Sequence, residues 1–250
     1  MIDVVARLAA AGCVAPDDEA RELLLDAPDA AVLETRVRRR EAGEHLPWIL
    51  GRVTFAGMTL SITSGVYTPR PQTGELARRA AARLPAGGVA LDLCTGSGAV
   101  AAWLQRARPG ASVLGVDIDA VAARCAAANG VLVVVADLAA PLHLAEAVDV
   151  VTAVAPYVPA AERRLLPADV QRHEPAHALD GGDDGLAVVR RVVADAARLL
   201  RPGGHLLLEL GGNQDAELAP DLAHHGFTSV ESWRDADGDL RGLVARRCGP

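Results

Sequence analysis

The chain has 250 residues, of which 50% are hydrophobic, 23% charged and 3% aromatic. This composition excludes a disordered chain and predicts one large domain, or a core domain with a small appendage. The net charge of −7 and the scarcity of aromatic rings argue against direct nucleic-acid binding. All 25 basic residues are arginine, which excludes chemistry that depends on lysine, including a phosphate-binding P-loop.

The four cysteines form no C-x-x-C pair and no zinc-type cluster with histidine. We therefore expect reduced thiols and no metal site. The N-terminus does not have the pattern of a signal peptide, and no run of about 18 apolar residues occurs. A cytoplasmic protein without membrane association is the resulting expectation.

Helical spacing dominates residues 1–51, which we expect to form an N-terminal helical domain. Asp17 and Asp18 are candidate caps of one helix, and Asp29 of the next. The side chains then become β-type between Arg52 and Ile62, around the Ala56-Gly57 turn, within a segment that we delimit as residues 52–68. They predict a β-hairpin linker to a third region, residues 69–250.

Apolar runs alternate with alanine-rich helical stretches from Val89 onward. The runs that predict strands buried on both faces are Val89–Leu93, Ser112–Val116, Leu132–Ala136, Val148–Ala153 and His205–Leu210. The helix candidates between them are Ala99–Ala107, Ala120–Asn129 and Leu186–Leu200. This alternation predicts a doubly wound α/β fold with a parallel sheet. Segments 228–234 and 240–246 predict an antiparallel hairpin at one sheet edge.

The turn after the first of these strands reads DLCTGSG, from Asp92 to Gly98. In a doubly wound sheet a ligand binds at the carboxyl ends of the strands, near the switch point. Gly96 and Gly98 allow the backbone to approach a ligand closely. Asp117 ends the next strand, where a carboxylate can accept both hydroxyl hydrogens of a ribose. These residues predict a nucleoside-containing cofactor.

Two cofactor classes fit this turn. A nicotinamide dinucleotide would match G-x-G-x-x-A, read from Gly96 to Ala101. Asp92, however, would repel a pyrophosphate, whereas it suits the amino group and sulfonium cation of S-adenosylmethionine. Asp137, followed by Leu138, ends the third strand, where it could bind the adenine amino group. We therefore favour S-adenosylmethionine, with S-adenosylhomocysteine as the product.

The fourth strand leads into a proline-flanked turn, Val154-Ala155-Pro156-Tyr157-Val158-Pro159. Such a turn would place backbone carbonyls and one ring beside the reactive end of the cofactor. An ordinary loop with a packing tyrosine is the alternative interpretation.

The sequence at this point resembles the HemK/PrmC-type protein-(glutamine-N5) methyltransferases. The segments that carry the resemblance are RREAGEHLPWILG (39–51), TPRPQT (68–73), DLCTGSG (92–98), ARCAAAN (123–129), HEPAHALDGGDDGL (173–186) and LRPGGHLLLELGGNQ (200–214). The resemblance implies a class I methyltransferase, with a Rossmann-like, seven-stranded, mostly parallel sheet and a small N-terminal helical domain. Its protein substrate would be a release factor.

Together with the resemblance, the motifs give candidate site residues. Cofactor-binding candidates are Arg70, Asp92, Thr95, Gly96, Gly98, Asp117, Ile118, Asp137 and Leu138. The candidates beside the acceptor, and hence for catalysis, are Val154, Ala155, Pro156 and Tyr157. No general base is evident.

Val154 and Gln72 depart from the family pattern. Where this chain has Val154, family members have an asparagine, whose side chain and the next backbone carbonyl accept the two hydrogens of the substrate amide. Valine cannot accept a hydrogen bond, so the Ala155 carbonyl is the only acceptor left. Gln72 replaces a glutamate and removes a charge near the expected site.

One further motif, His173-Glu174-Pro175-Ala176-His177, matches the zinc-protease pattern H-E-x-x-H. Zinc binding needs both imidazoles on one uninterrupted helical turn, and Pro175 disfavours helix there. We reject a metal site and, from the resemblance, expect a loop that borders the substrate channel.

Three functions are compatible with these observations. The first is methylation of a release-factor glutamine. The second is a repurposed relative that methylates a small molecule in specialised metabolism, and the third is a silent subunit that binds the cofactor and supports a partner protein.

Overall fold

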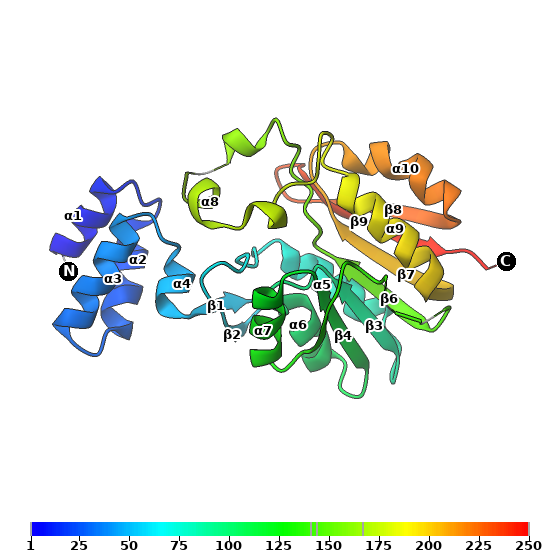
Figure 1. Ribbon diagram of the computed structural model, residues 1–250, viewed down its shortest axis with the longest axis horizontal. Coiled ribbons are helices and arrows are strands. Elements are labelled where there is room, and N and C mark those ends of the chain that lie inside the picture. Colours follow the sequence, from blue (N-terminus) through cyan, green and yellow to red (C-terminus); the bar gives the residue numbers. More distant parts are fainter. Residues whose placement is uncertain (1, 141, 144, 167, 250) are drawn as a thin grey trace.

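The computed structural model describes residues 2–140, 142–143, 145–166 and 168–249. The first helices are α1 (Ile2–Ala10), α2 (Pro16–Asp26), α3 (Ala30–Glu41) and α4 (Leu46–Leu50). They lie at one end of the molecule, blue in Figure 1. Leu8, Leu23 and Val37 are fully buried in a small core of their own.

The helix caps in this region agree with the sequence only in part. Asp29 caps α3 as predicted, because its Oδ1 accepts the Val32 N–H at 2.8 Å. The expected cap of α2 by Asp17 or Asp18 is wrong. Pro16 already occupies the first helical position, so that both carboxylates lie within the first turn, and no side chain caps the helix.

A two-stranded hairpin follows, formed by β1 (Arg52–Phe55) and β2 (Met58–Ser61) in antiparallel register. Ala56 and Gly57 at the turn have φ values of 45° and 80°, the left-handed pair that a two-residue hairpin turn requires. Phe55 and Met58 pack into the core of the following α/β region. The predicted hairpin is therefore confirmed.

The central sheet has seven strands. They are β3 (Val89–Leu93), β4 (Ser112–Asp117), β5 (Leu132–Val135), β6 (Val148–Ala153), β7 (Leu200–Glu209), β8 (Phe227–Arg234) and β9 (Leu240–Arg247). Their order is β5-β4-β3-β6-β7-β9-β8, and β9 alone runs in the opposite direction to the other six. The predicted α/β class and mostly parallel sheet are confirmed.

Two details of the strand predictions are wrong. The strand β7 begins at Leu200, not at His205, because the Leu200 end still pairs with Val148 across a bulge. The strand β5 is not buried on both faces, since it lies at the sheet edge, where the exposed fractions of Leu132 and Val135 are 70% and 55%. The terminal hairpin β8–β9 does form the opposite edge, as expected.

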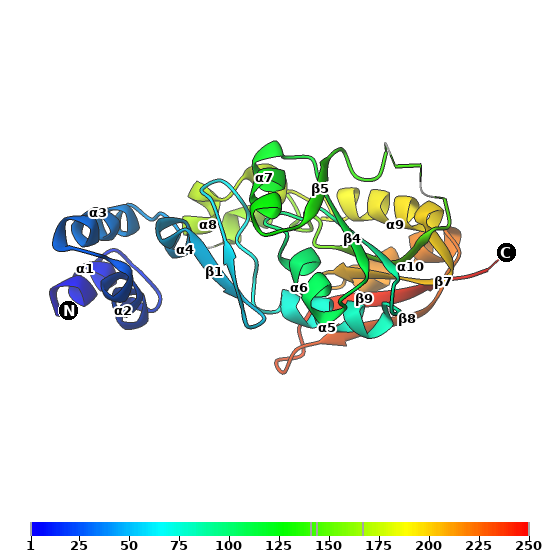
Figure 2. The ribbon, with the colours of Figure 1, turned by 90° about the horizontal axis from the view of Figure 1, so that it is seen from below.

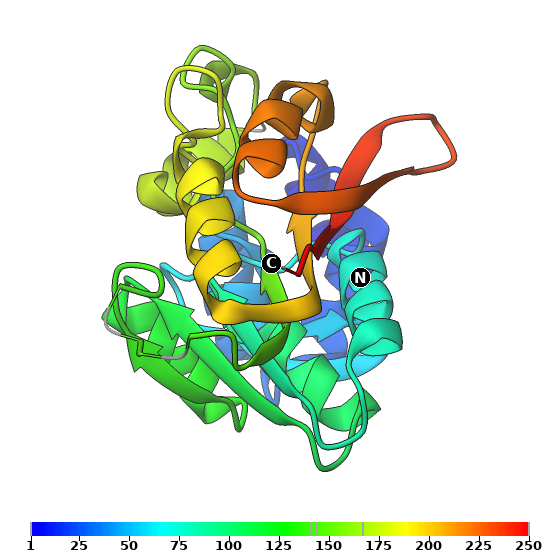
Figure 3. The same cartoon turned by 90° about the vertical axis from the view of Figure 1, so that its right-hand side faces the viewer.

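Helices cover both faces of the sheet, as Figures 2 and 3 show. They are α5 (Thr73–Arg83), α6 (Ala99–Ala107), α7 (Ala120–Ala128), α8 (Ala168–His173), α9 (Ala187–Leu199) and α10 (Gln214–His224), with short 3-10 turns at 163–165 and 176–178. One face packs against α9 and α10, and the other against α5 and α6. None of the described helices is long and apolar enough to cross a bilayer.

Asn129 ties the hairpin to the α/β region. Its side-chain Oδ1 accepts the Ser61 N–H at 2.8 Å, and its Nδ2 donates to the carbonyls of Ser61 and Ser97 at 2.9 Å.

At about 1 kcal/mol net per hydrogen bond, we expect N129A to lower the free energy of unfolding by ~1–3 kcal/mol in urea denaturation. Asn213, whose side chain makes no capping bond, is the matched control. If N213A were as destabilising as N129A, the hydrogen bonds of Asn129 would not account for the loss of stability.

Candidate functional site

The order in which the chain adds strands to the sheet reverses between β3 and β6. The chain leaves β3 for β4 and β5 on one side and returns to β6 on the other, so the carboxyl ends of these strands flank a switch point. A cavity of about 220 Å³ lies there, and we name it the first cavity. It occupies the position where ligands bind in doubly wound sheets.

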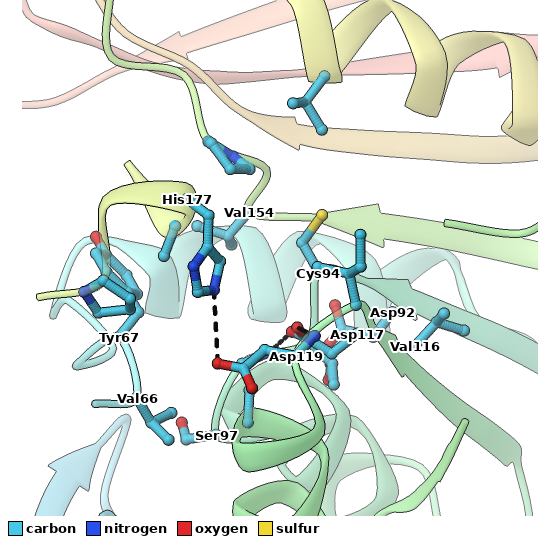
Figure 4. Close-up of a pocket in the computed structure, with 18 of the residues that line it drawn as sticks. Val66, Tyr67, Asp92, Cys94, Ser97, Val116, Asp117, Asp119, Val154 and His177 are labelled. Atoms are coloured by element: carbon cyan, nitrogen blue, oxygen red, sulfur yellow. Dashed lines mark hydrogen bonds and ion pairs between the residues drawn. The ribbon is translucent and has the colours of Figure 1, made fainter. Parts of the chain in front are cut away.

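Most of the predicted site residues border the first cavity. Those that do are Asp92, Thr95, Gly96, Asp117, Ile118, Asp137, Leu138, Val154 and Pro156. Figure 4 shows Asp92, Cys94 and Asp117 on one side of this space and Val154 on another. The loop after β3 and the ends of β4, β5 and β6 thus converge as the sequence indicated.

Asp117 is fixed by the backbone. Its Oδ2 accepts the Gly96 N–H at 2.7 Å, and its Oδ1 accepts the Asp119 N–H at 2.9 Å. Burial raises the pKa of this carboxyl group above its usual value. Each oxygen keeps a further lone pair, so the group can still accept hydroxyl hydrogens from a ligand.

Asp92 has a different environment from the one the sequence suggested. It is almost completely buried, and its two oxygens accept the hydroxyl hydrogens of Thr95 and Thr152, each at 2.6 Å. Burial raises its pKa to about 6. Asp92 therefore joins the loop after β3 to strand β6, in addition to bordering the cavity.

The loop after β3 contains three residues in the left-handed region, namely Cys94 (φ 56°), Gly96 (φ 57°) and Gly98 (φ 77°). Cys94 is unusual because non-glycine residues seldom adopt this conformation. Gly98 does not border the cavity. A Cβ atom there would lie 2.9 Å from Val131 Cγ2 and 3.1 Å from Ala126 Cα, whereas one on Gly96 would meet nothing within 4 Å. Gly98 therefore permits helix packing, and Gly96 keeps the cavity open.

A second cavity of about 420 Å³ adjoins the first. Tyr67, Val154 and Ala178 border both cavities and mark their junction. Ala155 and Tyr157 border only the second cavity. So does Arg70, which the sequence had assigned to the cofactor.

Tyr157 is held by two elements beyond its own loop. Its hydroxyl donates to Glu209 Oε1 at 3.0 Å, and its carbonyl accepts from Gln214 Nε2 at 2.8 Å. The other oxygen of Glu209 accepts the Thr73 hydroxyl at 2.6 Å. Burial raises the pKa of the Glu209 carboxyl group. Sequence reasoning missed Glu209 and Thr73, although both lie in segments that carry the family resemblance.

The residues of the H-E-x-x-H motif separate in space, as the proline indicated. Helix α8 ends at His173, and Pro175 precedes the 3-10 turn that carries His177. His177 Nε2 lies 3.5 Å from Asp119 Oδ2, and Figure 4 shows the pair facing each other beside the first cavity. Glu174 instead contacts Arg70.

Asp137 forms an ion pair with Arg191, whose Nη2 lies 2.8 Å from its Oδ2. Both side chains are about half exposed and border the first cavity. Sequence reasoning had assigned Asp137 but missed Arg191, which is brought to this point by α9.

Taken together, the first cavity offers oxygen acceptors on one wall and a glycine-lined approach on another. The second cavity is mostly apolar and meets the first at Val154. Such an arrangement can hold a donor and an acceptor molecule side by side with water displaced between them.

Comparison with known proteins gave no matching family model. Release factor glutamine methyltransferase of Mycolicibacterium smegmatis is 40% identical over 242 residues, which cover 92% of this chain and 85% of that protein. The 4-amino-L-phenylalanine/4-methylamino-L-phenylalanine methyltransferase of Streptomyces pristinaespiralis is 37% identical, with 97% and 87% covered.

Solved structures share the fold. A T. thermophilus 16S rRNA methyltransferase, in complex with AdoMet and guanosine, has a TM-score of 0.53 and 24% identity. The match covers 79% of this chain but only 44% of that one. A SAM-dependent O-methyltransferase of Thermotoga maritima has a TM-score of 0.52 and 14% identity, with 74% and 68% covered.

Substitution by alanine should lower the free energy of unfolding more at Gly98 than at Gly96. In G98A the new methyl group collides with Val131 and Ala126, and we expect a loss of ~3 kcal/mol in the free energy of unfolding. G96A carries only the strain of a positive φ, ~1 kcal/mol. Thermal or urea denaturation of both variants measures the difference, and equal losses would contradict the packing role of Gly98.

Asp92 predicts a pH dependence of stability. Because its pKa is raised from 3.8 to about 6 on folding, the folded state binds the proton more tightly, and its contribution to stability falls as pH rises through that interval. Relative to D92N, the wild type should lose ~2 kcal/mol of unfolding free energy between pH 4 and pH 7. Urea denaturation at several pH values measures it. A constant difference between the two proteins would contradict the shifted pKa.

Proposed function

This chain belongs to the family of release factor glutamine methyltransferases, and we propose that it transfers the methyl group of S-adenosylmethionine to an amine nitrogen of a small molecule. The observation that carries the proposal is the junction of the two cavities at Val154. The first cavity would hold the cofactor and the second the acceptor.

The first cavity offers hydrogen-bond acceptors that suit the cofactor. Asp117 would accept the ribose hydroxyl hydrogens, and Asp137 would bind the adenine amino group. Gly96 leaves space for close approach of the ligand. When bound, S-adenosylmethionine supplies an electrophilic methyl group. The chain's own residues would then orient the acceptor nitrogen and exclude water.

The acceptor side favours an amine over a glutamine amide. An amide nitrogen is a poor nucleophile and depends on oriented hydrogen-bond acceptors, one of which Val154 removes. A lost contact of this kind costs ~2–4 kcal/mol in the transition state. A neutral amine nitrogen has its own lone pair and needs less help. After transfer it releases its proton to solvent, in accord with the lack of an evident general base.

A relative supports this acceptor class. The Streptomyces pristinaespiralis protein is named for 4-amino-L-phenylalanine and its methylamino form, so the family includes a member that acts on an amino acid.

The second candidate for the acceptor is a release-factor glutamine. It is favoured by the 40% identity to the Mycolicibacterium smegmatis protein and by the Ala155 carbonyl beside the second cavity.

The two candidates predict opposite effects of V154N on the native activity, which should fall if the acceptor is an amine and rise if it is glutamine. With radiolabelled S-adenosylmethionine, we expect the wild type to methylate 4-amino-L-phenylalanine and to leave a release factor containing Gly-Gly-Gln unmodified. V154N should lower amine methylation and raise glutamine methylation at least ~30-fold, the gain from about 2 kcal/mol.

V154A is the matched control, since it changes the volume but adds no polar group. Efficient glutamine methylation by the wild type would overturn the amine proposal. Absence of S-adenosylhomocysteine binding in calorimetry would overturn methyl transfer altogether.

A further inference from the structure

The second cavity contains one permanently charged group, Arg70. None of its described lining residues is acidic, and most of its wall is apolar, as at Leu166, Val170 and Leu179. A guanidinium that keeps N–H donors beyond its own ion pair favours a ligand with one anionic group, because hydrogen bonds from a charged donor to a carboxylate are stronger than those to a neutral acceptor.

The buried carboxylate of Glu174 orients the guanidinium of Arg70. Arg70 Nη2 lies 2.7 Å from both oxygens of Glu174. The Glu174 side chain is completely buried, whereas that of Arg70 is 27% exposed. Glu174 therefore orients Arg70 but does not itself meet the contents of the cavity. The contacts with Glu174 use only Nη2, and the guanidinium also interacts with the Tyr67 side chain, but it has five N–H donors in all.

Arg70 also lies within reach of the junction. Its Cζ is 4.9 Å from the centre of the Tyr67 ring, and Tyr67 borders both cavities. A ligand that places a nitrogen beside Val154 would share the second cavity with Arg70, because both residues border it. The two ends of a small, elongated acceptor could be bound at once.

We propose that the acceptor carries a carboxylate, which Arg70 binds in the second cavity, so that the substrate class is an amino acid or a similar carboxylate-bearing amine. The assignment of the reacting end at Val154 rests on the proposed function. The carboxylate site itself rests on Arg70, its buried partner Glu174 and the absence of acidic residues from the described lining.

Calorimetry on the protein saturated with S-adenosylhomocysteine tests the site without requiring turnover. The probes are 4-amino-L-phenylalanine and its carboxamide, in which a neutral amide of similar size replaces the ionised carboxylate. We expect the acid to bind the wild type ~10–100-fold more tightly than the amide, as for a charge-assisted pair. In R70Q this preference should disappear while the affinity of the amide is kept.

Two further variants are controls for effects of R70Q on folding. R70Q removes the arginine that pairs with the buried Glu174, so R70Q/E174Q removes both charges together. R163Q removes another arginine–carboxylate pair, that of Arg163 with Asp180 at 3.0 Å, which borders neither cavity, and it should keep the preference for the acid.

The outcomes separate the two proposals. Equal binding of acid and amide, no binding of either, or a preference that survives in the Arg70 variants would overturn the carboxylate site. A marked loss of S-adenosylhomocysteine affinity in R70Q would also overturn it, because Arg70 would then bind the cofactor's carboxylate. If the acid is preferred but no methyl group is transferred to it, the site stands and the proposed function fails.

Discussion

A buried carboxylate connects the parts of the site. Asp92 accepts the hydroxyl of Thr95, in the loop after β3, and that of Thr152, in the neighbouring strand β6. Because Val154 follows Thr152 by two residues, this pair of hydrogen bonds sets the distance between the cofactor loop and the junction of the cavities. A buried carboxylate is costly unless it is hydrogen-bonded, so the two threonines make the arrangement stable as well as specific.

The acceptor side has an equivalent buried group. Glu209, at the end of β7, accepts hydrogens from Tyr157 and from Thr73 at the start of α5. Asp92 thus joins the loop after β3 to the neighbouring strand β6, and Glu209 joins the end of β7 to the loop after β6 and to the start of α5. These anchors give a rigid frame around the first cavity, which offers oxygen acceptors, and around the second cavity, whose wall is mostly apolar.

The sequence predicted the frame better than the contents of the site. Alternating apolar runs and helical stretches identify β3, β4 and β6 because burial on both faces dictates their composition. Local patterns did not identify α10, which contains Pro220, and they could not place Arg70 in the second cavity. Arg70 meets Glu174 across 104 positions of the chain. Pairings of this kind depend on the tertiary fold, and the hydrophobic periodicity of the sequence cannot predict them.

The position of Val14 extends the argument to the N-terminal helices. Val14 follows α1, has an exposed fraction of 98%, and still borders the second cavity together with Leu166 and Val170. The rim of that cavity is therefore built from segments that are far apart in sequence and apolar on both sides. Since the loop after β6 is held by Glu209 and Gln214, the rim can vary without disturbing the junction at Val154. A fold of this kind can change its acceptor through the rim and one residue at the junction while the cofactor side stays the same.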